Sequence, residues 1–272
     1  MEPEERELIQ VLVLSEVCRE MGPSLVFQGG TAIRVFLGGT RRSEDLDFYM
    51  AARTSHSLDR YVERIAKAIT RDLGYTGELT LESFKLNRQD RLNTVWFGFT
   101  WGEGRERSRL KVEFLEVSEH FQGISSQATL LATAPLIRRG ISSFGIFLDR
   151  LNLVVQVETP EGILADKVVA ILARPYVKGR DLWDVWFLTE VIGVSPSRDD
   201  VELRRKIYDA TPWKRSPAVG GRGWPERKEL VELLDRDLQR FLDRDETAAL
   251  RREDYGRILE SVENTLGVVG SV

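Results

Sequence analysis

The sequence is poor in the residues from which disulfides and zinc sites are built. It contains one cysteine, Cys18, and two histidines, His56 and His120. A single thiol cannot form an internal disulfide, and zinc sites draw their ligands mainly from Cys and His. Cys18 lies within an apolar run and is expected to be a small core residue. We therefore expect neither a disulfide framework nor zinc chemistry.

The chain also lacks long apolar runs and a large excess of one charge. No run approaches the roughly 20 apolar residues that a membrane-spanning helix needs. The residues from Met1 to Glu7 are acidic and lack the layout of a secretory signal peptide. We therefore expect a cytoplasmic protein with no membrane contact. The net charge is -4, so a nucleic-acid partner would have to meet a local basic surface.

Arginine is nevertheless locally dense. The clusters are Arg41-Arg42, Arg105 to Lys111, Arg138-Arg139 and Arg204 to Lys206. Such clusters are common on soluble proteins, so we expect each to be exposed to solvent and not to form a binding stripe.

The apolar pattern predicts helices and strands in the first part of the chain and helices after it. The expected helices there are 4–21, 31–37 and 59–74. The expected strands are 24–28, 45–50, 79–86, 93–101, 110–117, 144–148 and 151–157. Residues 122–135 are polar and predict a loop or a short helix. Beyond them, helices are expected at 161–173, from 180, from about 200, at 225–242 and at 247–266.

Gly29, Gly30 and Thr31 lie where the first strand gives way to a helix. Backbone N–H groups at a helix start have no intrahelical partners and bind phosphate well. Glycine lets a phosphate approach the backbone closely. Gly30 and Thr31 could therefore hold the phosphates of an NTP, with the Thr31 hydroxyl as a further donor. Taken alone, this short motif favours the other interpretation, a strand-to-helix turn capped by Thr31.

The strand that follows changes this balance. Asp45 and Asp47 alternate with apolar residues, so both carboxylates point to the same side of the strand. Like charges this close repel each other unless cations lie between them. Two Mg²⁺ ions roughly 3.5–4 Å apart serve this purpose where nucleotidyl groups are transferred. An edge strand with exposed acids is the weaker alternative, because Asp is a poor strand former.

Glu113 could be a third carboxylate of the same site. It lies on the expected strand 110–117, two residues after Lys111. If that strand neighbours the strand of Asp45, Glu113 could bind a metal ion. Equally, Lys111 and Glu113 could both be solvated, and the sequence leaves the choice open.

A second group of charged residues follows more than a hundred residues later. Lys167 lies on the expected helix 161–173, and Asp181 and Asp184 share one face of the next helix. The aromatic residues around Asp184 indicate that this helix is buried. A buried carboxylate needs a cation, and Arg180 or Lys167 could supply it. The group is therefore either a structural ion-pair cluster or part of an active site.

Three blocks of sequence together resemble the AbiEii/AbiGii-type nucleotidyltransferase toxins, a family of the polymerase-β-like nucleotidyltransferase superfamily. They are Gln28-Gly-Gly-Thr-Ala-Ile33 with Arg42-Ser-Glu-Asp-Leu-Asp-Phe48, Leu164-Ala-Asp-Lys-Val168, and Arg180-Asp-Leu-Trp-Asp-Val185. Their order and rough spacing fit from residue 25 to about 190, and the last helices agree only in general character. The first block alone would fit any polymerase-β-like nucleotidyltransferase, and the other two narrow the resemblance. Thr31 replaces the Ser of many members and keeps the hydroxyl.

The resemblance implies an α/β (α+β) fold in two domains. Residues 1–157 would form a nucleotidyltransferase lobe with a mixed sheet, and residues 158–272 a mainly helical lobe that completes the active site. It also implies roles for named residues. Asp45 and Asp47 would hold Mg²⁺ or Mn²⁺, Lys167 would bind the triphosphate, and Asp181 or Asp184 would complete the catalytic group. The nucleotide would be bound by Gly29, Gly30, Thr31, Arg42, Ser43 and Lys167.

Family members are typically toxins with a separately encoded, often DNA-binding antitoxin, and some transfer nucleotides to tRNA. We therefore expect transfer of NMP from an NTP such as ATP or GTP to an acceptor hydroxyl, with the tRNA 3′ end as the leading acceptor. Transfer to a protein or a small molecule is the first alternative. A module that binds nucleotide or antitoxin without catalysis is the second, and the intact pair of aspartates speaks against it.

Overall fold

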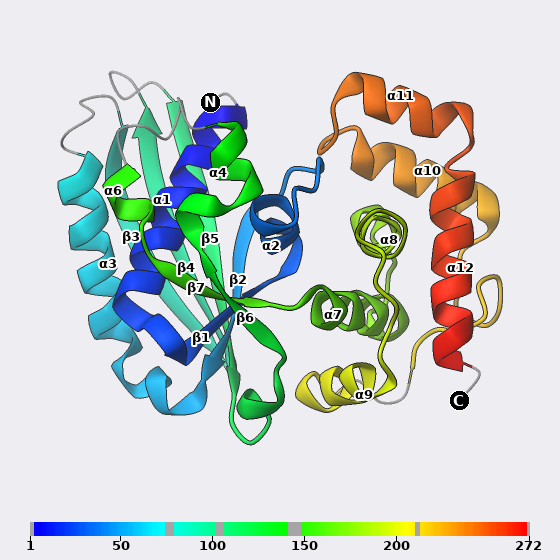
Figure 1. The fold of residues 1–272 in the computed structure, drawn as a ribbon, viewed down its shortest axis with the longest axis horizontal. Coiled ribbons are helices and arrows are strands. Elements are labelled where there is room, and N and C mark those ends of the chain that lie inside the picture. Colours follow the sequence, from blue (N-terminus) through cyan, green and yellow to red (C-terminus); the bar gives the residue numbers. More distant parts are fainter. Residues whose placement is uncertain (1–2, 74–78, 102–105, 141–147, 210–212, 271–272) are drawn as a thin grey trace. The chain divides into compact units, whose positions relative to one another are not determined.

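The computed structural model describes residues 3–73, 79–101, 106–140, 148–209 and 213–270. The chain divides into two compact units (Figure 1). Unit 1 comprises Met1–Gly38 and Glu44–Glu158, and unit 2 comprises Gly39–Ser43 and Thr159–Val272. The short segment 39–43 therefore belongs with the C-terminal helices, although the residues on both sides of it belong to unit 1.

Unit 1 is built on a seven-stranded mixed sheet with the order β3-β4-β5-β2-β1-β7-β6. The pairs β2–β5 and β1–β7 are parallel, and the other neighbours are antiparallel. The expected α/β fold with a mixed sheet is therefore confirmed. The strands are β1 (Leu25–Gln28), β2 (Asp45–Ala51), β3 (Leu79–Gln89), β4 (Leu92–Trp101), β5 (Glu106–Val117), β6 (Ser126–Leu130) and β7 (Val154–Glu158).

The helices of unit 1 include α1 (Pro3–Met21) and α3 (Leu58–Leu73), which pack against each other beside the sheet (Figure 1). Apolar side chains of α3 recur at helical spacing and are buried, as an amphipathic helix requires. On the covered side of the sheet, the rings of Phe48 and Phe114 stack with their centroids 5.4 Å apart. The remaining helices are α2 (Gly29–Phe36), α4 (Pro135–Arg139) and α6 (Leu148–Leu151).

Two expectations for the end of unit 1 were wrong. The polar stretch 122–135 contains strand β6, which pairs with β7. Because β6 is an edge strand with exposed or half-buried residues, it lacks the apolar alternation that marks a strand. Leu148–Leu151 forms helix α6, so the next strand begins at Val154 and not at Leu151. The strand expected at 144–148 falls almost entirely outside the described residues.

Unit 2 is helical in the part of the chain that the structure describes. Helix α8 packs against α7, α10 and α12. Helix α7 begins at Pro160, one residue before the expected start, and Thr159 Oγ1 accepts a hydrogen bond from the N–H of Gly162. The described helices of unit 2 are α7 (Pro160–Ala173), α8 (Gly179–Trp186) with a π-helical continuation (Phe187–Ile192), α9 (Arg198–Ile207), α10 (Arg227–Leu238), α11 (Arg244–Arg252) and α12 (Gly256–Gly270).

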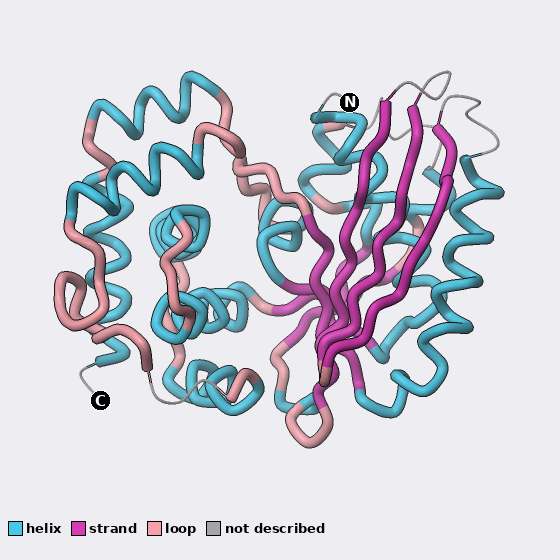
Figure 2. The backbone as a smooth tube through the Cα atoms, turned by 180° about the vertical axis from the view of Figure 1, so that it is seen from behind, coloured by secondary structure: helices cyan, strands magenta, loops and turns pink. Residues whose placement is uncertain are grey.

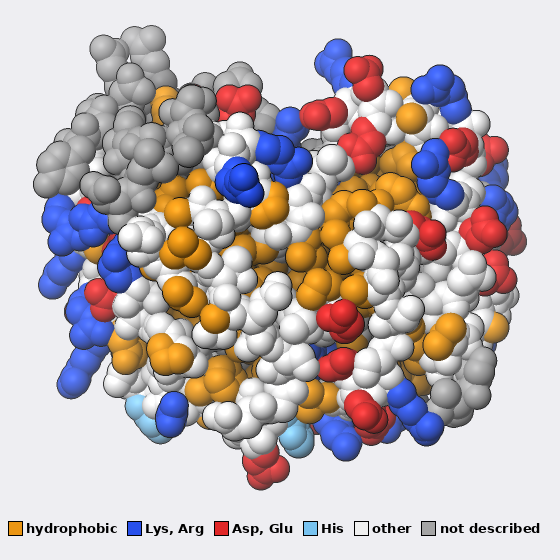
Figure 3. Space-filling view, in the orientation of Figure 1, with side chains coloured by type: hydrophobic (Ala, Val, Ile, Leu, Met, Phe, Trp, Pro, Cys, Tyr) orange, Lys and Arg blue, Asp and Glu red, His pale blue; other side chains and the backbone are white. Residues whose placement is uncertain are grey.

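Charged side chains of both signs intermingle over α10 and α11 (Figure 3). The expectation that every arginine cluster is exposed to solvent is wrong for two arginines. Arg41 is only 3% exposed and Arg204 is fully buried. Arg204 Nε lies 3.2 Å from Asp166 Oδ1, and this ion pair offsets part of the free-energy cost of burying the guanidinium. Among the described helices, none combines the length and the apolar character needed to cross a membrane.

Candidate active site

Asp45 and Asp47 lie at the start of β2, on the same side of the strand. Leu46 and Phe48 between and after them are buried, which leaves both carboxylates on the opposite face of the sheet. In the parallel pairing with β5, Asp45 lies opposite Lys111 and Asp47 lies opposite Glu113. Four charged side chains therefore share one small area of the sheet.

Lys111 forms ion pairs with two of these carboxylates. Its Nζ lies 2.9 Å from Asp45 Oδ2 and 3.0 Å from Glu113 Oε2. Burial alone would lower the pKa of Lys111, but the contacts with Asp45 and Glu113 outweigh it and the pKa lies above its usual value. The ammonium group therefore stays charged and partly neutralises the carboxylates. Glu113 is beside the aspartates but ion-paired, so its role as a metal ligand stays a prediction.

The first residue of α2, Gly29, packs closely against the side chain of Asp47. Gly29 has a φ of +81°, and a Cβ at this position would lie 2.8 Å from Asp47 Oδ2. Both facts require glycine here, because other residues rarely adopt this conformation and a side chain would collide with the carboxylate. The Gly-Gly-Thr motif and the Asp-Leu-Asp motif, which the sequence shows as separate segments, therefore meet in unit 1.

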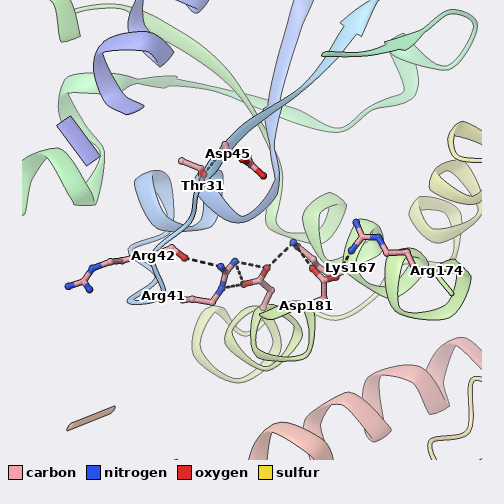
Figure 4. A network of polar contacts seen from close by, with 8 residues as sticks. Thr31, Arg41, Arg42, Asp45, Lys167, Arg174 and Asp181 are labelled. Carbon is pink, nitrogen blue, oxygen red and sulfur yellow. Dashed lines mark hydrogen bonds and ion pairs between the residues drawn. The ribbon is translucent and has the colours of Figure 1, made fainter. Parts of the chain in front are cut away.

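Thr31 makes a second connection between these motifs. Its buried hydroxyl donates a hydrogen bond to the backbone oxygen of Asp45 (Figure 4). A hydroxyl has one proton, so in this arrangement Thr31 positions Asp45 and can only accept a further hydrogen bond. Gly30 lies buried in the same helix start. The proposed contacts of Gly29, Gly30 and Thr31 with nucleotide phosphates stay predictions.

The residues around Asp45 and Asp47 fit a hard divalent cation. Mg²⁺ prefers oxygen ligands and is commonly bound by one or two carboxylates together with substrate phosphates and water. Two aspartates on one face meet this requirement. Within the described ranges, no group of three or more His, Cys, Asp and Glu side chains could hold a metal ion.

In unit 2, Arg41 makes a buried bidentate ion pair with Asp184. Arg41 Nε and Nη2 donate to Asp184 Oδ1 and Oδ2 at 2.8 and 2.9 Å. The guanidinium also lies 5.7 Å from the ring centroid of Trp183 and 5.9 Å from that of Phe241. Such pairs are strong because both oxygens are engaged in fixed geometry. Arg41 is thus a key residue of this buried group, although its place in an arginine cluster predicts that it is exposed.

Lys167 connects this ion pair to a second one (Figure 4). Its Nζ lies 2.8 Å from Asp184 Oδ2 and 3.2 Å from Asp181 Oδ1, and Arg174 also contacts Asp181. Burial would lower the pKa of Lys167, but the charges of Asp184 and Asp181 raise it overall. Burial would likewise raise the pKa of Asp181, but Lys167 and Arg174 lower it to about 2. Lys167, one of the two cations expected for Asp184, contacts that carboxylate in a buried network, and it contacts Asp181 as well.

Arg42 and Ser43 differ from Arg41 in exposure. Arg42 Nη2 lies 2.9 Å from Asp243 Oδ1, and its side chain is 38% exposed. The Arg42 N–H donates to the backbone oxygen of Phe241 at 2.8 Å, which fixes the segment before Asp45. Ser43 is half-buried. The exposed guanidinium of Arg42 is accessible to a phosphate, whereas Arg41 is not.

The chain matches the AbiEii nucleotidyl transferase toxin family of type IV toxin–antitoxin systems over residues 12–267. It belongs to this family. The family predicted from three short blocks is therefore confirmed over nearly the whole sequence, and this AbiEii-family chain is a nucleotidyltransferase. No curated protein sequence is similar enough to count as a relative.

Two solved structures from Helicobacter pylori share the fold of this AbiEii-family chain. JHP933 has 16% sequence identity and a TM-score of 0.53, over 97% of this chain and 90% of that protein. A second H. pylori protein, a candidate nucleotidyltransferase, has 16% identity and a TM-score of 0.54, over 97% and 92%. At this identity the likeness shows the fold alone.

Proposed function

We propose that this AbiEii-family chain transfers a nucleoside monophosphate from an NTP to an acceptor hydroxyl, with Mg²⁺ or Mn²⁺ bound by Asp45 and Asp47. The observation that carries the proposal is the contact between the two motifs in unit 1. Gly29 lies against the Asp47 carboxylate, and Thr31 holds the backbone of Asp45. The backbone that would bind phosphate therefore lies next to the carboxylates that would bind the metal, which supports the proposal because nucleotidyl transfer needs both.

In this reaction the acceptor oxygen attacks the α-phosphorus of the NTP. A new bond forms between them, the bond from the α-phosphorus to the oxygen that bridges to the β-phosphate breaks, and pyrophosphate leaves with that electron pair. The hydroxyl proton passes to solvent. Bound at Asp45 and Asp47, the divalent cation would lower the pKa of the hydroxyl and neutralise charge on the α-phosphate. Backbone N–H groups at Gly30 and Thr31 would bind phosphate oxygens.

The same proposal extends to residues of unit 2. Lys167, Arg42 and Ser43 would act on the triphosphate, with Lys167 offsetting the charge of the leaving pyrophosphate. The raised pKa of Lys167 supports this role, because the ammonium stays protonated at neutral pH. Asp181 and Asp184 would orient Lys167, which their distances to its Nζ support.

The acceptor we propose is the 3′ end of a tRNA, and the biological setting is that of a toxin opposed by an antitoxin. The test is incubation of the protein with α-labelled NTPs and Mg²⁺, together with tRNA or with protein extract. Label in the tRNA fraction supports the proposal, and label in protein alone would contradict the RNA acceptor. Absence of label from every fraction would refute nucleotidyl transfer.

A further inference from the structure

The sheet face that carries Asp45 and Asp47 continues across three more strands. Lys111 of β5 lies opposite Asp45, Trp96 of β4 lies opposite Lys111, and Lys85 of β3 lies opposite Trp96. Residues directly opposite in neighbouring strands point to the same face. These side chains therefore form one row across the sheet, with the aspartate at one end and Lys85 at the outer strand.

This face is open at β3 and β4. Trp96 is 38% exposed, whereas Val95 and Phe97 on either side of it are at most 1% exposed and belong to the core. Figure 2 shows strands β3 to β5 in the foreground, with no described helix in front of them. Trp96 therefore presents part of its indole to solvent, where it is available to a partner.

The neighbours of Trp96 are suited to a phosphate backbone. Lys85 is exposed directly opposite the indole, and Arg109 is exposed on the same face, opposite Gly98. Gly98 carries no side chain, and a Cβ there would lie 2.7 Å from Ser83 Oγ. The surface beside the indole is therefore low, with a hydroxyl group on it. An aromatic platform on a sheet, flanked by basic residues, is the usual way to bind single-stranded nucleic acid.

The charges of this face favour nucleic acid over protein. The centre of a protein interface is depleted in charged residues, whereas here the exposed indole is flanked by the exposed side chains of Lys85 and Arg109. The chain as a whole has a net charge of -4. A basic patch on a protein of this charge is the local surface that a polyanion needs.

We propose that the face formed by Lys85, Trp96, Gly98 and Arg109, here called the β3–β5 platform, binds the single-stranded 3′ segment of an RNA acceptor. One base stacks on Trp96, and Lys85 and Arg109 contact phosphates. Lys111 remains with Asp45 and Glu113. Strands lie about 4.8 Å apart, so Trp96 and Asp45 are separated by two strand spacings, about 10 Å. A short length of RNA spans this distance and delivers its terminal hydroxyl to Asp45.

This inference rests on the proposed function for its choice of RNA as acceptor, but binding can be tested without catalysis. The probe is a 5′-fluorescein-labelled single-stranded RNA of about 12 nucleotides with a free 3′ hydroxyl. Its affinity for the full chain is measured by fluorescence anisotropy, without NTP or divalent ions. The variants are Trp96→Ala, Trp96→Phe and Lys85→Ala.

Phe84→Ala is the matched control. Phe84 is 44% exposed on β3, next to Lys85, but it lies opposite the buried Phe97 and lines a groove beside α3 on the other face of the sheet. Lys67→Ala on α3, in the same groove, is the control for Lys85→Ala. Circular dichroism melts of each variant show whether the fold is intact, and Lys85 lies on the outer strand, where truncation leaves the core untouched.

We expect Trp96→Ala to weaken RNA binding roughly 5- to 150-fold, the range for loss of one base stacked on an aromatic ring. Trp96→Phe keeps most of the affinity. Lys85→Ala reduces the slope of log affinity against log salt by about 0.7, as loss of one phosphate contact on a single strand does. Phe84→Ala and Lys67→Ala leave both quantities unchanged. Wild-type affinity in Trp96→Ala and Lys85→Ala, equal losses in Trp96→Ala and Phe84→Ala, or a wild-type protein that binds no RNA overturns the proposal.

Failure of the platform and failure of the proposed function give different results. A wild-type protein that binds RNA through Trp96 but transfers no nucleotide to any acceptor refutes the transfer reaction and supports the platform. A wild-type protein that labels an acceptor, with the RNA affinity and the acceptor KM unchanged in Trp96→Ala, supports the reaction and refutes the platform.

Discussion

Arg41 and Arg42 are neighbours in the sequence, yet the structure predicts opposite consequences for removing them. The Arg41 side chain is 2% exposed and forms two hydrogen bonds with the fully buried Asp184. The Arg42 side chain is 38% exposed and pairs with Asp243, which is 77% exposed. Replacing each with Ala therefore compares a buried ion pair with a surface ion pair at adjacent positions.

The expected loss for Arg41→Ala follows from what remains around Asp184. Removing one partner of a buried ion pair costs about 3–5 kcal/mol, because the other charge stays buried without it. Lys167 Nζ still lies 2.8 Å from Asp184 Oδ2 and partly compensates the charge. The loss should therefore lie near the lower end, about 3 kcal/mol, which corresponds to a fall in Tm of roughly 6–12 °C.

The assay is thermal unfolding of both variants by circular dichroism, which reports the loss of helix in both units. Arg42→Ala should cost only about 0–1 kcal/mol, because exposed ion pairs are screened by solvent. If the free energies of unfolding of Arg41→Ala and Arg42→Ala differ by less than about 1 kcal/mol, the buried ion pair does not stabilise unit 2. The argument for a structural network around Asp184 would then be refuted.

Three further predictions follow from the same contacts. Lys167→Met should raise the KM for NTP in a protein that still folds, and an unchanged KM and kcat would remove Lys167 from the reaction. Gly29→Ala should cost about 1–2 kcal/mol because of its positive φ and should weaken transfer by displacing Asp47; wild-type stability and transfer would contradict this close approach. Asp181 has its pKa lowered to about 2, so its stabilisation is present above its unfolded pKa of about 4 and disappears as the pH falls from about 4 to 2. Urea unfolding should therefore show a loss on the order of 2 kcal/mol over this range that is absent in Asp181→Asn, and identical pH profiles would refute the assignment.

The fold could be predicted from the sequence wherever one side of an element is buried. The alternation around Leu46 and Phe48 predicted β2, and the spacing of apolar residues in Leu58–Leu73 predicted α3. Strand β6 was not predictable in this way, because an edge strand with exposed side chains has no apolar alternation. Its place is set by the pairing with β7, which is a tertiary contact.

The candidate site could be predicted only in part, for a related reason. The motifs around Gly29 and Asp45 indicated phosphate and metal chemistry, but the ion pair between Lys111 and Asp45 depends on the β2–β5 register, which the sequence does not contain. The sequence predicts that Arg41 is exposed, because clusters of arginine usually lie on the protein surface. Its burial depends on Asp184, which is 143 residues away in the chain.

In the proposed reaction Asp45 and Asp47 carry nucleotidyl transfer, and substitution of each carboxylate tests this role. Transfer of label from an α-labelled NTP to tRNA is compared for the wild-type chain, Asp45→Asn, Asp47→Asn and the control Asp59→Asn, an exposed acid on α3. Both site variants should remain folded and lose transfer by a factor of about 100 or more, because the charge stabilisation by the metal is lost. Asp59→Asn should keep wild-type transfer. Full transfer by folded Asp45→Asn and Asp47→Asn would show that these carboxylates do not carry the reaction.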